Sequence, residues 1–371
     1  MREPILKAVA MPPRVFWAPM LPMVANFSVQ MAIMLMLQGA FPGRIIPDFF
    51  IWSFVIVHIF LVIYSRKEPH LSKIMQSFGS VINHWNKDTL KNDTLKIREE
   101  NGALITGDNR IVRCISFEQG LNSTTEFQKW LEQIQVYPIK IQIQQSLDKK
   151  DILIFSAPME HKNDLDYCVR YTLSALSSAW PQETDSFETR RLWDILNGKI
   201  IFQKKEKIIR LPDNTYLGFV GIQKLGDFSD SEMLFEILNL GPRVFIQHHI
   251  ESIQKDKANL LLIQQRKIAL FTTFSQNIYD QYTDALISLQ NGSSLNRYML
   301  SIGVNASTLS DLDFLRKQIT GILKRYGYQG ICEKNLNKAL FLTQFPDKTI
   351  LPREVLFLSN NISSMVCSKK R

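Results

Sequence analysis

Two residue patterns in this sequence could do chemistry, and neither meets the requirements of its site. A phosphate-binding loop needs a Gly-Lys followed by Ser or Thr, with a second Gly five residues earlier. Gly198-Lys199 is followed by Ile200 and has no such earlier glycine. His248 and His249 are adjacent on a predicted strand, where neighbouring side chains point to opposite faces, so they cannot share one metal ion. We predict no catalytic residue, no cofactor and no metal in this chain.

Two apolar stretches near the N-terminus organise the chain instead. Residues 15–39 contain no charged residue, and residues 45–64 contain only Asp48. Each stretch is long enough to cross a bilayer core of about 30 Å as a helix that rises about 1.5 Å per residue. A turn that contains Pro42 and Gly43 separates them. We therefore predict a transmembrane hairpin within residues 1–70. A cleaved signal peptide and a buried hairpin of a soluble protein are the alternatives.

The charges that flank the two stretches predict their orientation. Basic residues precede the first stretch and follow the second, and cationic flanks stay on the cytoplasmic side. Both termini and the remainder of the chain should then be cytoplasmic. Indole rings favour the membrane interface, and a Trp lies near the start of each stretch. The candidate membrane-interface residues are Arg14, Trp17, Trp52, Arg66 and Lys67.

Composition favours a lipid partner over nucleic acid. The formal net charge is +9, and much of it lies in the flanks, in residues 87–98 and in the C-terminal tail 369–371. This distribution suits anionic headgroups better than a nucleic-acid groove, which needs basic residues interleaved with aromatic ones on one face. The four cysteines are far apart in the sequence, which is typical of reduced thiols in a cytoplasmic domain.

Residues 71–98 predict an interfacial helix followed by a charged linker. The helix, over residues 70–85, would place one apolar face on the membrane. That face consists of Leu71, Ile74, Phe78, Ile82 and Trp85.

Residues 99–371 predict an α+β domain with partly antiparallel sheets, because strands, hairpins and helices alternate. The predicted strands are 103–106, 110–118, 139–145, 151–157, 208–211, 216–225, 243–253, 297–304 and 328–332; the predicted helices are 124–135, 160–180, 184–197, 229–238, 255–290, 310–326 and 334–345. Residues 297–332 would form one split β-α-β unit, whose helix begins at a capping box of Ser310 and Asp313.

The helix predicted over residues 255–290 carries one apolar face that includes Phe274 and Ile278. This face can be interpreted as core or as a contact with another subunit. Loss of a buried Phe side chain would cost about 3–5 kcal/mol in the first case.

The chain resembles two components of VirB-type type IV secretion and conjugation machines. The first 80 residues are similar to the small inner-membrane subunit in their arm AMPPRVFWAPMLP, their two close spans and their exit YSRKEPH. Residues 95–371 look like the N-terminal, non-motor domain of the large secretion ATPase. The segments that carry this second resemblance are YDQYTDALISLQNGSS, YMLSIGVNASTLSDLD, LKRYGY and LFLTQFPDKTILPREVLFLSNNIS. The two subunits occur fused in some secretion systems.

The resemblance implies an assembly scaffold in the bacterial inner membrane that docks the secretion ATPase at the cytoplasmic face. It implies other secretion subunits as partners, together with self-association. By this resemblance the motor domain and its phosphate-binding loop should begin after residue 371. The chain is then either the N-terminal portion of a longer fusion or a natural version that lacks the motor, and in neither case do we expect it to hydrolyse ATP. The alternatives are a membrane-tethered cytoplasmic binding or sensor domain unrelated to secretion, and a membrane enzyme whose site has no recognisable motif.

Overall fold

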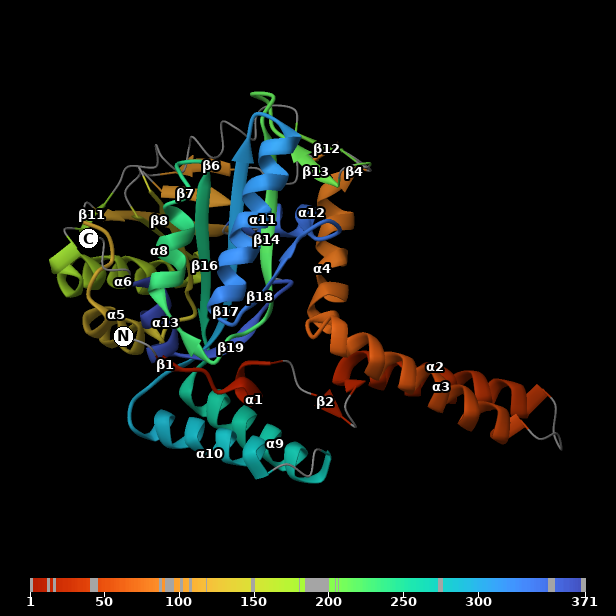
Figure 1. Cartoon of the computed structure of the whole chain (residues 1–371). Coiled ribbons are helices and arrows are strands. Elements are labelled where there is room, and N and C mark those ends of the chain that lie inside the picture. The colour runs from red at the N-terminus through yellow and green to blue at the C-terminus, as the bar shows by residue number, and fades with distance from the viewer. Residues whose placement is uncertain are drawn as a thin grey trace.

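A large antiparallel sheet forms the centre of the chain (Figure 1). The computed structural model describes residues 3–11, 14–15, 18–40, 46–86, 89–90, 97–100, 103–106, 109–117, 119–147, 151–179, 181–183, 200–203, 205, 207–272, 276–345 and 351–367. The sheet order is β4 (Trp85–Asn86), β5 (Thr89–Leu90), β12 (Ile201–Gln203), β13 (Ile208–Arg210), β14 (Tyr216–Lys224), β17 (Leu295–Ala306), β16 (Val244–Ser252), β9 (Lys140–Ser146), β10 (Asp151–Pro158), β8 (Arg110–Phe117), β7 (Ala103–Thr106) and β6 (Ile97–Glu100). Three further strands pair with strands of this series: β11 (Pro181–Glu183) with β8, β18 (Gln329–Cys332) with β14 and β19 (Val355–Leu358) with β17.

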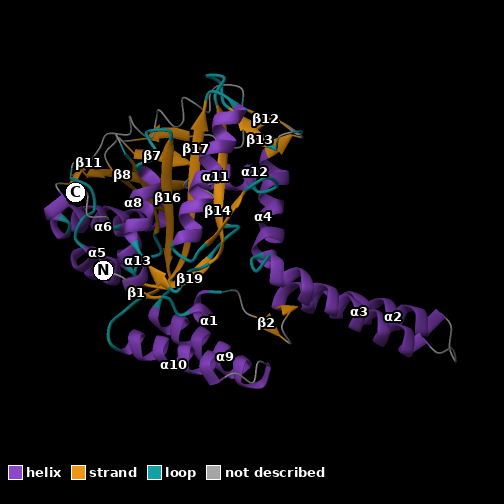
Figure 2. Ribbon diagram, viewed as in Figure 1, coloured by secondary structure: helices purple, strands orange, loops and turns teal. Residues whose placement is uncertain are grey.

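Helices pack against both faces of this sheet (Figure 2). Each face buries its own core. The main core lies under α5 (Thr124–Ile134), α6 (Lys162–Ala175), α8 (Ser231–Leu238), α11 (Leu309–Arg325) and α13 (Ser359–Val366). The second core lies under α4 (Leu71–His84) and α12 (Asn337–Thr343) and contains Phe219 and Met299. Side chains alternate between the two faces along each strand, which is why one sheet can support two cores. We call the sheet with its covering helices the α+β domain. The predicted α+β class with antiparallel pairing is thus confirmed.

The predicted β-α-β unit is present. Strand β17, helix α11 and strand β18 follow one another, and β14 lies between the two strands and pairs with both. The helix begins one residue earlier than predicted. Its N-cap is Thr308, whose side chain accepts a hydrogen bond from the amide of Asp311, so the capping box assigned to Ser310 was wrong.

The long helix predicted over residues 255–290 is two helices, α9 (Lys255–Thr272) and α10 (Gln276–Gln290), which pack against each other. The intervening sequence has no Gly or Pro to signal the break, but Thr and Ser, which are weak helix formers, are concentrated there. Ile278 is half-buried against the small core that α9 and α10 share, whereas Phe274 lies outside the described residues. The helix predicted over 184–197 also lies outside them.

The two apolar stretches form a helical hairpin that projects from the α+β domain (Figure 1). Its helices are α2 (Met20–Ala40) and α3 (Ile46–Lys67), and both are long and apolar enough to cross a membrane. Helix α2 begins at Met20 and not at residue 15 as predicted, because the ring of Pro22 would clash with the carbonyl of Ala18 in a longer helix. Two short paired strands, β2 (Arg14–Val15) and β3 (Ala18–Pro19), precede it instead.

Candidate functional site at the base of the apolar hairpin

Two segments attach the hairpin to the α+β domain, one that precedes α2 in the chain and one that follows α3. The chain reaches α2 from an N-terminal strap, residues 3–11, and it leaves α3 through Glu68, Pro69 and His70 into α4. Both segments are held by side chains that are distant in the sequence.

The first attachment is a bidentate ion pair. The Glu68 carboxylate, just beyond α3, accepts hydrogen bonds from both terminal nitrogens of Arg353, at 2.9 Å for Nη1–Oε1 and 3.1 Å for Nη2–Oε2. The Nε of the same guanidinium donates to the Glu333 carboxylate. The Arg353 side chain is only 2% exposed. One buried cation therefore joins the end of the hairpin to the inside of the domain.

Electrostatics and sterics around Arg353 fit this arrangement. Burial would lower the pKa of Arg353, but the Glu333 and Glu68 carboxylates outweigh it and raise that pKa, so the guanidinium stays charged. Arg316 of α11 donates to the carbonyls of Phe219 and Glu333, which fixes the backbone beside the pair. Only glycine fits at position 221, since a Cβ there would lie 2.7 Å from Arg353 Cδ and closer still to Glu333 Oε1.

Further contacts continue this attachment into α4. The side-chain amide of Gln223 on β14 donates through Nε2 to the carbonyl of Lys67 at 2.6 Å, which satisfies one of the last carbonyls of α3. Lys73 in the first turn of α4 forms an ion pair with Glu354 at 3.0 Å. His70 between the helices is buried, and its pKa is lowered to about 4, first by burial and then by the charge of Arg353.

The second attachment is the N-terminal strap. Strand β1 (Glu3–Pro4) pairs with β15 (Phe228–Ser229), and the carbonyl of Pro4 accepts a hydrogen bond from Asn361 at 2.9 Å. Helix α1 (Lys7–Ala10) buries Val9 and Ala10. Residue 8 is held at both of its backbone groups, since its amide donates to Gln281 and its carbonyl accepts from the Tyr282 hydroxyl.

Polar contacts also fix α2 against α3. Ser53 of α3 donates to Gln30 Oε1 of α2 at 2.6 Å, and within α2 the side chain of Gln30 donates to Asn26 Oδ1 at 2.8 Å. Phe27 and Phe54 meet edge to face with ring centroids 5.9 Å apart. An interhelical hydrogen bond such as the one from Ser53 helps to set the register of two helices in an apolar environment. Large apolar side chains are exposed along both described helices of the hairpin, as at Met36 and Phe60.

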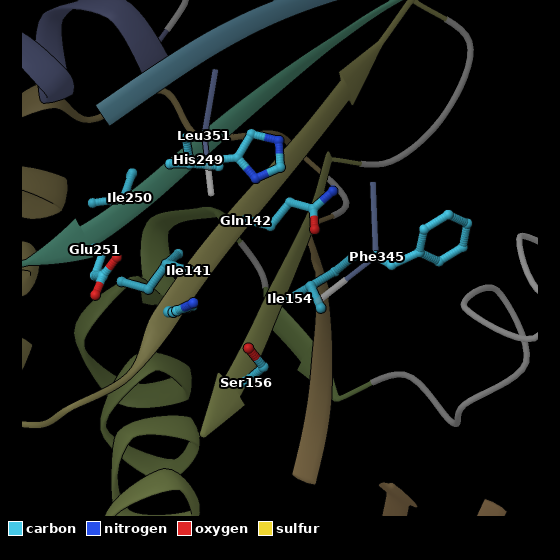
Figure 3. Close-up of a pocket in the computed structure, with 10 residues that line it drawn as sticks. Ile141, Gln142, Ile154, Ser156, His249, Ile250, Glu251, Phe345 and Leu351 are labelled. Carbon is cyan, nitrogen blue, oxygen red and sulfur yellow. The ribbon is translucent and has the colours of Figure 1, made fainter. Parts of the chain in front are cut away.

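A small cavity lies on the second face of the sheet, among β9, β10 and β16 (Figure 3). Its volume is about 30 Å³, which suits one or two water molecules and no nucleotide. Gln142, Ser156 and His249 line it, and His249 Nε2 has no hydrogen-bond partner among the described residues. Burial, followed by the charge of Lys140, lowers the pKa of His249 to about 3. No group of three or more His, Cys, Asp or Glu side chains that could hold a metal occurs among the described residues.

The structure places the predicted interface residues at both ends of the hairpin. Arg66 and Lys67 are exposed at the domain end of α3, and Trp52 is exposed near its opposite end. Arg14 lies in β2, with a side chain outside the described set, and Trp17 is also outside it. Sequence reasoning missed Glu68, Glu333 and Arg353. No local pattern signals a pair that is 285 residues apart in the chain.

Together, the fold and this site define a mixed α+β domain that holds an apolar helical hairpin at two points. Residues 182–353 match the family described as CagE, TrbE, VirB family, component of type IV transporter system. The resemblance to a VirB-type secretion component is thus confirmed over this segment. The segment includes Gly221, Arg316, Glu333 and Arg353, whereas Glu68 lies outside it. No curated protein matches the chain.

We expect Arg353→Met to destabilise the chain by about 3–5 kcal/mol, because Glu333 and Glu68 would lose the buried cation that compensates them. The measurement is the free energy of unfolding of the full chain in detergent, from urea titration. The matched control is Arg325→Met, which removes the exposed pair with Glu236 and should cost at most about 1 kcal/mol. Equal costs for the two variants would contradict the structural role of Arg353.

We expect His70 to make stability pH-dependent. The unfolded chain binds a proton at His70 near pH 6.5, and the folded chain does so only near pH 4. This contribution to stability is therefore fully present above pH 6.5 and is lost as the pH falls from 6.5 to about 4. Melting temperatures over this range should fall less steeply for His70→Gln than for the parent chain. Equal slopes would show that His70 is accessible to protons when folded.

Proposed function

We propose that the chain is a membrane-anchored assembly component of a type IV secretion apparatus. In this proposal the α2–α3 hairpin crosses the bacterial inner membrane, and the α+β domain lies at its cytoplasmic face, where it docks the secretion ATPase. The observation that carries the proposal is the attachment of the hairpin at two points, by Glu68 to Arg353 and by the N-terminal strap.

Two attachments do what a flexible linker cannot. A hairpin joined to the domain by one flexible segment would let the domain rotate freely beneath the membrane. Here the strap before α2 and the buried pair after α3 restrict that rotation. A movement of the domain is therefore coupled to the hairpin in the membrane. The exposed Arg66 and Lys67 at the domain end of α3 support the orientation, because that end would face anionic headgroups on the cytoplasmic side.

We further propose that this chain serves as a scaffold and not as the motor. The support is the lack of a phosphate-binding loop in the printed sequence, where Gly198-Lys199 precedes Ile200. The match to a component of a type IV transporter supports contacts with other subunits of such an apparatus, and self-association is part of the same proposal.

The topology of the hairpin tests the membrane assignment. Single cysteines replace Lys7, Gly43 or Lys91 in a chain whose half-exposed Cys332 is changed to Ser. Intact cells are then treated with a thiol reagent that does not cross the inner membrane. We expect labelling only at Gly43→Cys, because the turn between the spans should face outward while both flanks stay inside. Labelling at Lys91→Cys would contradict the hairpin topology.

A further inference from the structure

Helix α4 carries a second apolar surface that the fold leaves exposed. Its packed side consists of Ile74, Ser77 and Val81, which face the second core. Next to it lie Met75, Phe78 and Ile82, whose exposed fractions are 54%, 41% and 71%. We call these three residues the α4 stripe. Because each residue turns a helix by about 100°, a shift of one position puts the stripe beside the packed side and not opposite it.

This arrangement differs from the single apolar face predicted from sequence. Ile74 was expected to face the membrane with Phe78 and Ile82, yet it is buried in the second core. Helix α4 therefore has three sides: one that packs on the domain, one that is apolar and exposed, and one that is polar and includes Gln76. A helix at a boundary between protein, lipid and water needs three such sides.

The position of α4 points to lipid as the occupant of the exposed side. The helix runs across the axis of the hairpin and starts where the hairpin leaves the domain (Figure 1). Two ion pairs fix this corner, Glu68 with Arg353 just before α4 and Lys73 with Glu354 in its first turn. If α3 crosses the bilayer, α4 lies along the membrane surface.

Exposed side chains on both sides of the corner support the same occupant. Ile63 near the end of α3 and Met75 and Phe78 of α4 all expose apolar side chains. Arg66 and Lys67 are exposed at the corner itself, where they can meet anionic headgroups.

We propose that the α4 stripe lies in the boundary between headgroups and acyl chains of the cytoplasmic leaflet. This inference rests on the proposed function, since it requires the hairpin to span the membrane. It assigns the apolar contact to Met75, Phe78 and Ile82 and excludes Ile74 from it. The α+β domain is then held against the lipid surface as well as tethered to it.

Depth-dependent fluorescence quenching tests the inference on the full chain in liposomes of phosphatidylcholine and phosphatidylglycerol. In the Cys332→Ser background, an environment-sensitive fluorophore is attached at Ile82→Cys. We expect blue-shifted emission and a loss of roughly half the fluorescence when lipids carry a nitroxide close to the headgroup. A nitroxide at the end of the acyl chain should quench this label less, because the stripe reaches only the boundary.

Two matched labels separate the possible failures. Leu35→Cys, exposed within α2, reports whether the hairpin enters the bilayer, and Val136→Cys, exposed on the α+β domain, should stay unquenched. Quenching at Leu35→Cys without quenching at Ile82→Cys would overturn the stripe inference while the membrane span stands. Loss of quenching at both positions would overturn the proposed function. Blue-shifted but unquenched emission at Ile82→Cys would show that protein covers the stripe, which also overturns the inference.

Discussion

The arrangement of the hairpin depends on one buried arginine. Arg353 binds the Glu68 carboxylate through both terminal nitrogens and the Glu333 carboxylate through Nε, so a single guanidinium connects the end of α3 to the residue just after β18. A buried ion pair of this kind adds little net stability, since desolvation offsets its attraction. It does impose geometry, because a planar guanidinium holds a carboxylate in one orientation. We interpret its role as one of specifying the direction in which the hairpin leaves the domain.

The other contacts at the base of the hairpin extend this constraint. The glycine at position 221 leaves room for the Arg353–Glu333 pair, and Gln223, two residues along the same strand, binds the last carbonyl of α3. The N-terminal strap is also fixed to the α+β domain, but by strand pairing and by hydrogen bonds to its backbone groups instead of an ion pair. The two attachments thus fix the apolar hairpin relative to a domain whose residues 182–353 match a component of a type IV transporter system.

Local sequence patterns predicted most of the fold, but they did not predict contacts between residues that are distant in the chain. The hairpin of β7 and β8, the strand β16 and the apolar length of α2 and α3 follow from periodicity and composition, which are local properties. The division between α9 and α10 was missed because no Gly or Pro marks it. The ion pair between Glu68 and Arg353 was missed because, in the sequence, Glu68 is one charged residue among several in a polar connector. Only folding brings Arg353 close to it. Phe274 stays a prediction, whereas Ile278 packs against the core of α9 and α10.

The central claim is that the hairpin and the α+β domain have one fixed relative orientation. Pulsed electron spin resonance on the full chain in lipid bilayers measures this directly, with nitroxides at Ile56→Cys on α3 and Phe314→Cys on α11, both exposed, in the Cys332→Ser background. The account predicts one narrow distance distribution, which broadens when Arg353 is changed to Met. A broad distribution in the chain that retains Arg353, or one that the Arg353 substitution leaves unchanged, would contradict it.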